Sequence, residues 1–130
     1  MNEKHFLIID DKSFYFSMIK DHLGMLGYKG LFEHASGAKI AIEYLESCLK
    51  NSLKVDLIIC DLVMPEFSGV DFVKAIRKSK HFNNIPILMF TTESEKLDIL
   101  TAVKHGANDY IFKPWEESEL GNKVKRLLEI

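Results

Sequence analysis

The 130-residue chain has the length of one domain, and hydrophobic residues make up 47% of it, enough for one sizeable core. Its formal charge of −2, from 17 basic and 19 acidic residues, gives no electrostatic case for binding nucleic acid or a membrane surface. No apolar stretch approaches the ~20 residues that span a bilayer, and the polar start MNEKHF has no signal-peptide core. The two cysteines form no CxxC pair, which indicates reduced thiols. We therefore expect one cytoplasmic domain over residues 1–130.

Short apolar runs alternate along the chain with longer segments of helical periodicity. The runs, which we expect to be strands, are Phe6–Ile9, Leu31–Ala35, Leu57–Cys60, Ile87–Phe90 and Tyr110–Phe112. Three of them are almost continuously apolar, which is typical of parallel strands buried on both faces. The predicted helices are Ser13–Gly27, Gly37–Asn51, Val70–Ser79, Glu95–His105 and Glu117–Ile130. Gly121 lies inside the last of these, costs roughly 1 kcal/mol relative to alanine, and has no explanation in the sequence.

This alternation predicts an α/β fold, a doubly wound, flavodoxin-like parallel sheet of five strands with five helices. The expected strand order is 2-1-3-4-5, with a switch point for ligands between strands 1 and 3. Polar residues follow four of the runs, and the parallel topology brings them to one edge of the sheet. They are Asp10 and Asp11 after the first run, Asp61 after the third, Thr91 and Thr92 after the fourth, and Lys113 after the fifth.

Three carboxylates at one sheet edge repel each other, so either some are protonated or a cation lies among them. Carboxylate oxygens suit Mg²⁺, or Mn²⁺ in its place. A carboxylate beside such an ion, with a hydroxyl and a lysine nearby, can attack phosphorus and form an aspartyl phosphate. Simpler interpretations remain for each residue: Asp11 or Ser13 caps a helix, Asp61 lies in a turn, Thr91 fills a strand, and Lys113 is solvated. Their joint placement at one edge favours the metal site.

Four motifs, IIDDKS, LIICDLVMPEFSG, PILMFTT and GANDYIFKPW, occur in order over essentially the whole chain. Together they resemble the receiver domain of two-component response regulators, and the length is similar to the stand-alone chemotaxis type. The resemblance implies that Asp61 accepts a phosphoryl group from a histidine kinase or a histidine phosphotransfer protein. It also implies that Asp11 and Asp61 bind Mg²⁺ directly, that Asp10 assists, and that the backbone carbonyl of Val63 is a further ligand.

By the same resemblance, Thr91 bonds to the phosphoryl group, Lys113 pairs with it, and the Lys113–Pro114 peptide bond is cis. Tyr110 is expected to turn inward as Thr91 moves. The output surface would be helix 4, strand 5 and helix 5, which a downstream protein binds, and the domain would be a monomer or a phosphorylation-promoted dimer. Such a domain is a regulatory phosphoacceptor rather than an enzyme, although it assists its own phosphorylation and dephosphorylation.

Some residues depart from the family pattern. Val63 has no polar side chain to hold an attacking water, which predicts slow self-dephosphorylation unless Glu93, two residues after Thr91, compensates. Phe14 and Phe16 follow the acidic pair. Either these two aromatic side chains dock a kinase or phosphotransfer domain, with Phe16 exposed, or they pack locally.

Other functions compete with the signalling one. A phosphatase of the haloacid dehalogenase type needs a second aspartate two residues after its nucleophile, and Asp61 is followed by Leu62 and Val63. A flavin-binding module would have a hydroxyl- and glycine-rich loop after strand 1 rather than DDKSFYF. A pseudo-receiver, folded but not phosphorylated, is also possible, although no key residue is missing. Whether the native protein continues past Ile130 into an output domain stays open.

Overall fold

The computed structural model describes residues 3–129, without the side chain of Glu93, and confirms the predicted fold class. Within these residues a five-stranded parallel sheet has the order β2-β1-β3-β4-β5. The strands are β1 (Glu3–Ile9), β2 (Lys29–Ala35), β3 (Leu57–Asp61), β4 (Ile87–Thr92) and β5 (Asp109–Lys113). The α-helices are α1 (Ser13–Met25), α2 (Ala38–Lys50), α3 (Gly69–Lys78), α4 (Lys96–Lys104) and α5 (Glu117–Leu128). No helix in this range is long and apolar enough to cross a membrane.

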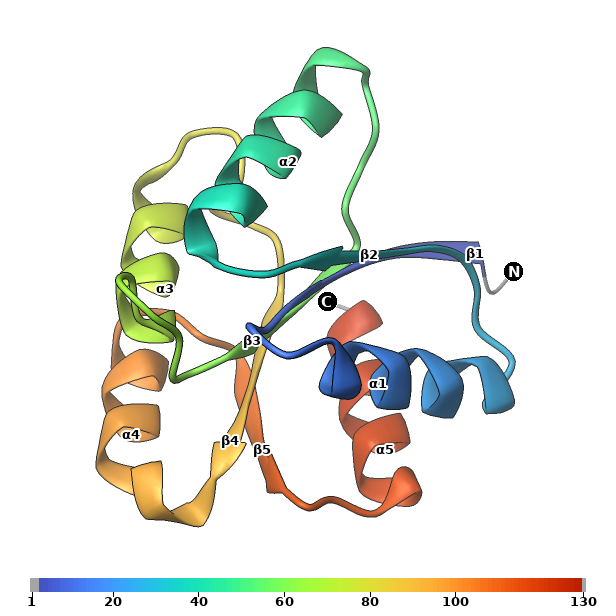
Figure 1. Ribbon diagram of the computed structural model, residues 1–130. Helices are drawn as coiled ribbons and strands as arrows, with labels where there is room; N and C mark the ends of the chain where they lie inside the picture. The colour runs from blue at the N-terminus through green and yellow to red at the C-terminus, as the bar shows by residue number, and fades with distance from the viewer. Residues whose placement is uncertain (1–2, 130) are drawn as a thin grey trace.

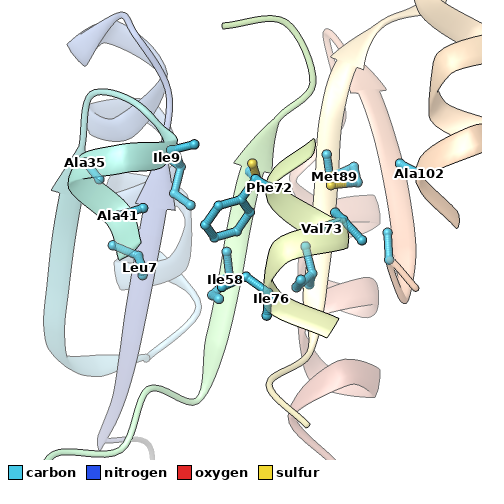
Figure 2. Packing of buried hydrophobic residues seen from close by; sticks show 14 of the residues in the cluster. Leu7, Ile9, Ala35, Ala41, Ile58, Phe72, Val73, Ile76, Met89 and Ala102 are labelled. Carbon is cyan, nitrogen blue, oxygen red and sulfur yellow. The ribbon is translucent and has the colours of Figure 1, made fainter. Parts of the chain in front are cut away.

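The helices cover both faces of the sheet, with α1 and α5 on one side and α2, α3 and α4 on the other (Figure 1). Alternate residues of β1 therefore face different layers. Phe6 and Ile8 pack in the cluster with α1 and α5, whereas Leu7 and Ile9 pack in the cluster with α2 and α3. In this second layer, Phe72 of α3 is fully buried against the sheet (Figure 2). Burial on both faces is why these runs are apolar without alternation.

Strands β1 and β2 begin earlier than the apolar runs predicted, and three strands, β3, β4 and β5, extend one or two residues further than predicted at their carboxyl ends. Their last residues stay paired, with Asp61 opposite Phe90 and Thr92 opposite Lys113. Asp61, Thr91 and Lys113 are thus held by the strands themselves, whereas Asp10 and Asp11 follow the end of β1. The predicted fourth helix differs as well, because Glu93–Glu95 form a short 3-10 helix, η1, before α4 begins at Lys96.

Gly121, unexplained by the sequence, lies where α5 meets the end of α1. A Cβ atom added to Gly121 would lie 2.9 Å from Cδ1 of Leu26. The side chain of Leu26 therefore occupies the space that a larger residue at position 121 would need. Glycine lowers the helix propensity of α5 at this position, but it allows Leu26 to pack closely against the helix.

Arg77 of α3 joins segments that are distant in the sequence. Its guanidinium donates hydrogen bonds to the carbonyl oxygens of Gly106 (2.9 Å), Ile85 (2.9 Å) and Asn83 (3.1 Å), and to Oδ1 of Asn108 (2.8 Å). The same Oδ1 accepts the backbone N–H of Ile87 at the start of β4. Partial burial lowers the pKa of Arg77. This side chain thus fastens α3 to the turns that precede β4 and β5.

Candidate functional site

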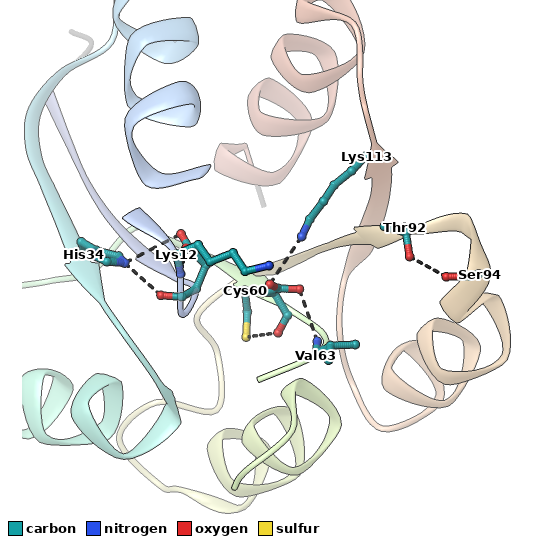
Figure 3. A network of polar contacts seen from close by, with 9 residues as sticks. Lys12, His34, Cys60, Val63, Thr92, Ser94 and Lys113 are labelled. Carbon is teal, nitrogen blue, oxygen red and sulfur yellow. Dashed lines mark hydrogen bonds and ion pairs between the residues drawn. The ribbon is translucent and has the colours of Figure 1, made fainter. Parts of the chain in front are cut away.

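The carboxyl ends of β1, β3, β4 and β5 bring the predicted site residues to one edge of the sheet (Figure 3). The most direct contact joins Lys113 and Asp61, whose Nζ and Oδ2 atoms lie 3.4 Å apart. Both side chains are largely buried, at 12% and 8% exposed. The peptide bond between Lys113 and Pro114 is cis, as the resemblance implied. Two strand ends separated by 52 residues in the sequence thus form a buried ion pair.

Asp61 is held from two sides. Its Oδ1 accepts the backbone N–H of Val63 at 3.3 Å, while Oδ2 faces Lys113. Burial raises the pKa of Asp61, because it disfavours the charged form of the carboxyl group. The ammonium of Lys113 and the N–H of Val63 lower this pKa, and the charge of Asp11 raises it. Lys113 therefore favours the charged form of this buried carboxylate.

Asp10 is fully buried at the end of β1. Its Oδ1 accepts the backbone N–H of Lys12 at 2.6 Å, but its Oδ2 has no hydrogen-bond partner among the described residues. Burial is the main cause of a raised pKa at Asp10; the N–H of Lys12 and the imidazole of His34 lower it, while Asp61 and Asp11 raise it further. A buried carboxylate oxygen without a donor is costly unless something else binds it.

Asp11 is exposed. The alternative that Asp11 or Ser13 caps α1 is contradicted, because the cap position is Lys12 and no side chain makes a capping hydrogen bond there. The acidic pair thus divides into a buried carboxylate, Asp10, and an exposed one, Asp11.

The donor set fits a hard divalent cation. Among the described residues no three His, Cys, Asp or Glu side chains form a ready metal cluster. Mg²⁺, however, typically takes only one or two protein carboxylates and keeps several water ligands. The unpartnered Oδ2 of Asp10, the exposed carboxylate of Asp11 and the carboxylate of Asp61 are oxygens of this type. Asp61 and Asp11 raise the pKa of Asp10, and Asp11 also raises the pKa of Asp61, which indicates repulsion among these carboxylates. A cation would relieve this repulsion.

Thr91 and Tyr110 lie on neighbouring strands, with Thr91 near the carboxyl end of β4 and Tyr110 near the start of β5, where it pairs with Met89. The side chain of Thr91 is buried within β4. Tyr110 is half-buried in β5, with its ring centroid 5.4 Å from that of Phe112. Lys123 of α5 donates a hydrogen bond to the carbonyl of Tyr110, and its Nζ lies 5.0 Å from the Tyr110 ring centroid. Tyr110 is therefore in contact with α5 as well as with the sheet.

Two aromatic contacts of the site did not stand out in the sequence. Tyr15 of α1, inside the predicted helix Ser13–Gly27, has its ring next to the ammonium of Lys113. His34 of β2 has Nε2 2.9 Å from the carbonyl oxygen of Asp10. The parallel pairing of β2 with β1 was the signal that places His34 there, since Ile8 pairs with His34 and Asp10 follows two residues later.

The expectation that Phe16 is exposed was wrong. Its ring is half-buried and stacks on His34, with centroids 5.0 Å apart. Phe14, one of the pair, is instead the exposed aromatic on α1. His22 of α1 is partly buried and accepts the indole N–H of Trp115 at 3.2 Å.

Comparisons with known proteins agree with this geometry. The family model for the response regulator receiver domain matches residues 6–125. The chemotaxis protein CheY1 of Helicobacter pylori is 38% identical over 122 residues, which cover 94% of each chain. A solved putative response regulator from Chloroflexus aurantiacus is 31% identical with a TM-score of 0.82, covering 98% of this chain and all of the other. The chemotaxis response regulator CheY4 of Vibrio cholerae is 28% identical with a TM-score of 0.80, covering 96% and 98%.

The chain therefore belongs to the receiver domains of two-component response regulators, and its relatives include chemotaxis regulators. Receiver domains are regulatory modules rather than classical enzymes.

Proposed function

We propose that the chain is a phosphorylatable switch in which Asp61 accepts a phosphoryl group from a histidine kinase or a histidine phosphotransfer protein. The observation that carries this proposal is the buried contact between Asp61 and Lys113 beside the unpartnered Oδ2 of Asp10. A carboxylate oxygen of Asp61 attacks phosphorus while the bond to the donor breaks. Lys113, already 3.4 Å away, offsets the charge on the phosphoryl oxygens, and the Thr91 hydroxyl donates to one of them.

Mg²⁺ would be held by Asp11, Asp61 and the backbone carbonyl of Val63, with Asp10 in support; Mn²⁺ can replace it. The bound ion would neutralise charge on the phosphoryl oxygens and relieve the repulsion among the carboxylates. We expect Asp11→Asn to weaken Mg²⁺ binding more than Asp10→Asn, because Asp10 is buried and turned toward Lys12. A titration followed by the fluorescence of Trp115 measures both affinities; equal losses would contradict these roles.

The output is a change of population between two conformations. Thr91 moves toward the phosphoryl group, Tyr110 turns inward, and the face formed by α4, β5 and α5 changes. Leu97 on α4 is 80% exposed, and Leu100 and Val103 of the same helix are also exposed. These apolar side chains support a protein partner at this face. Binding of the downstream protein is expected to weaken on Leu97→Glu while phosphorylation of Asp61 is retained.

Incubation with Mg²⁺ and a small acyl phosphate tests the proposal by intact mass. Wild type is expected to gain one phosphoryl group and Asp61→Asn none. A phosphoryl group on Asp61→Asn would place the acceptor elsewhere. A wild type that gains nothing would instead favour the pseudo-receiver, a folded interaction module without phosphorylation. A phosphatase would turn over acyl phosphate far in excess of protein without accumulating the adduct, so phosphate release in the same samples distinguishes that activity.

A further inference from the structure

The ammonium of Lys113 is enclosed by two aromatic rings as well as by Asp61. Its Nζ lies 3.9 Å from the ring centroid of Tyr15 and 4.8 Å from that of Phe90. The carboxylate Oδ2 of Asp61 is 3.4 Å away. The lysine therefore approaches its acidic partner across the face of a tyrosine that comes from a different layer of the fold, helix α1.

The ring of Tyr15 is itself held in place by packing. Its centroid lies 5.8 Å from that of Phe90, which is fully buried in β4, and 6.3 Å from that of Trp115. Phe14 adds an edge contact at 5.2 Å. Contacts with three other rings fix the orientation of the Tyr15 ring. The ring face that contacts Lys113 is therefore in place without a phosphoryl group on Asp61.

A lysine side chain has four flexible methylenes, and a single contact with a carboxylate leaves it much rotamer freedom. The negative face of an aromatic ring attracts an ammonium, and the attraction is larger where water is excluded. This attraction also allows the ammonium to slide across the ring. A carboxylate in the place of Tyr15 would instead neutralise the lysine and hold it at one point.

We propose that Tyr15 is a positioning residue whose ring face holds the ammonium of Lys113 at Asp61 and keeps it there as the phosphoryl group arrives. This inference rests on the proposed phosphorylation of Asp61. With an acyl phosphate as donor, one oxygen of Asp61 bonds to phosphorus. The bond from phosphorus to the acyl oxygen breaks, and its electron pair leaves with the carboxylate product. Lys113 keeps its proton throughout and moves from Asp61 toward a phosphoryl oxygen.

The kinetic test compares initial rates of phosphorylation by Mg²⁺ and acetyl phosphate, measured by intact mass. Tyr15→Leu removes the ring and is expected to react roughly three- to tenfold more slowly. Tyr15→Phe keeps the ring face and is expected to react at nearly the wild-type rate. In a Lys113→Met background, Tyr15→Leu should cause no further slowing, because the group that Tyr15 positions is gone.

Three kinetic outcomes would overturn the proposal. They are no slowing in Tyr15→Leu, equal slowing in Tyr15→Phe, and the same slowing in the Lys113→Met background. Equal slowing in Tyr15→Phe would assign the effect to the hydroxyl rather than the ring, and an undiminished effect without Lys113 would assign it to packing of α1.

A second measurement needs no phosphorylation and so separates this inference from the proposed function. In a ¹H–¹³C correlation spectrum, ring currents from Tyr15 should shift the Cε protons of Lys113 upfield in wild type and in Tyr15→Phe. The shift should decrease clearly in Tyr15→Leu, with the remainder coming from Phe90, and the signal itself is assigned by its absence in Lys113→Met. An unshifted signal in wild type would overturn the proposal. A shifted signal in a wild type that gains no phosphoryl group would support the placement of Lys113 and contradict phosphorylation instead.

Discussion

Asp10 lies with its Oδ2 3.8 Å from Nε2 of His34, too far for a hydrogen bond, while the same nitrogen is 2.9 Å from the Asp10 carbonyl oxygen. His34 thus fixes the backbone at the end of β1 and leaves one buried carboxylate oxygen unpartnered. Such an arrangement costs stability in the metal-free protein, and it is consistent with the supporting role proposed for Asp10 beside a bound cation.

Replacing Asp10 with asparagine should therefore stabilise the metal-free protein. The Oδ1 bond to Lys12 is retained, and the buried negative charge is removed. We expect the free energy of unfolding at neutral pH to rise by about 1 kcal/mol, the order of an unsatisfied buried polar group. Urea unfolding in the presence of a chelator measures the change, and Asp21→Asn, at an exposed site on α1, is the matched control. A loss of stability in Asp10→Asn would contradict the account.

The same carboxylates predict the pH dependence of stability. The pKa values of Asp10 and Asp61 are raised in the folded state above the ordinary 3.8, chiefly by burial. Between that value and the raised pKa, the folded state binds more protons than the unfolded state, so their contribution to stability falls as pH rises through the folded pKa. Acidification from neutral pH should thus stabilise wild type relative to Asp10→Asn, until the pH approaches 3.8. A difference between the two proteins that does not vary with pH would contradict this.

We expect the apolar side chain of Val63 to make loss of the phosphoryl group from Asp61 slow. Its side chain is apolar and 55% exposed beside Asp61, so it offers no polar atom to hold an attacking water. Val63→Asn is expected to accelerate loss of the phosphoryl group several-fold, while Val63→Ala, which is equally apolar, leaves the rate close to wild type. Phosphate loss after removal of the donor, followed by intact mass, measures both. If neither variant, or both variants, lost the phosphoryl group faster than wild type, the missing polar atom at Val63 would not explain the slow loss.

Arg77 is expected to be a major contributor to stability although it lies outside the site. Arg77→Lys keeps a positive charge but lacks the planar fork that reaches Gly106, Ile85 and Asn108 together. We expect the free energy of unfolding to fall by about 2 kcal/mol, because several hydrogen bonds from a charged group are lost. Lys78→Met, at the exposed neighbouring position, should change it little. Urea unfolding of both proteins checks the difference; equal effects would contradict this role for Arg77.

The sheet and the edge that carries the site were predictable because the central strands are buried on both faces. Phe6–Ile9, Leu57–Cys60 and Ile87–Phe90 are continuous apolar runs, and each delivers polar residues to the same sheet edge. Strand β2 had a weaker sequence pattern because it is the outermost strand on one side of the sheet, and several of its side chains, including Leu31, are exposed. The apolar runs predicted β3, β4 and β5 too short at the site, because backbone pairing does not depend on side-chain polarity and continues through Asp61 and Lys113.

The contacts that tune the site were not predictable from sequence pattern. Tyr15 lies in a predicted helix, and only tertiary packing brings its ring next to Phe90 and under the ammonium of Lys113. Arg77 looks like an ordinary basic residue at the end of a short helix, since its acceptors are backbone carbonyls contributed by turns. Such partners depend on tertiary packing rather than on residue type.

The central claim is that Asp61 is the residue that becomes phosphorylated. Reduction of the phosphorylated protein with borohydride converts an aspartyl phosphate to homoserine, and peptide mass spectrometry then locates the changed residue. The account predicts conversion at residue 61, dependent on Mg²⁺ and absent when the acyl phosphate is omitted. Conversion at Asp10 or Asp11, or at Asp61 with equal yield in the presence of a chelator, would contradict it.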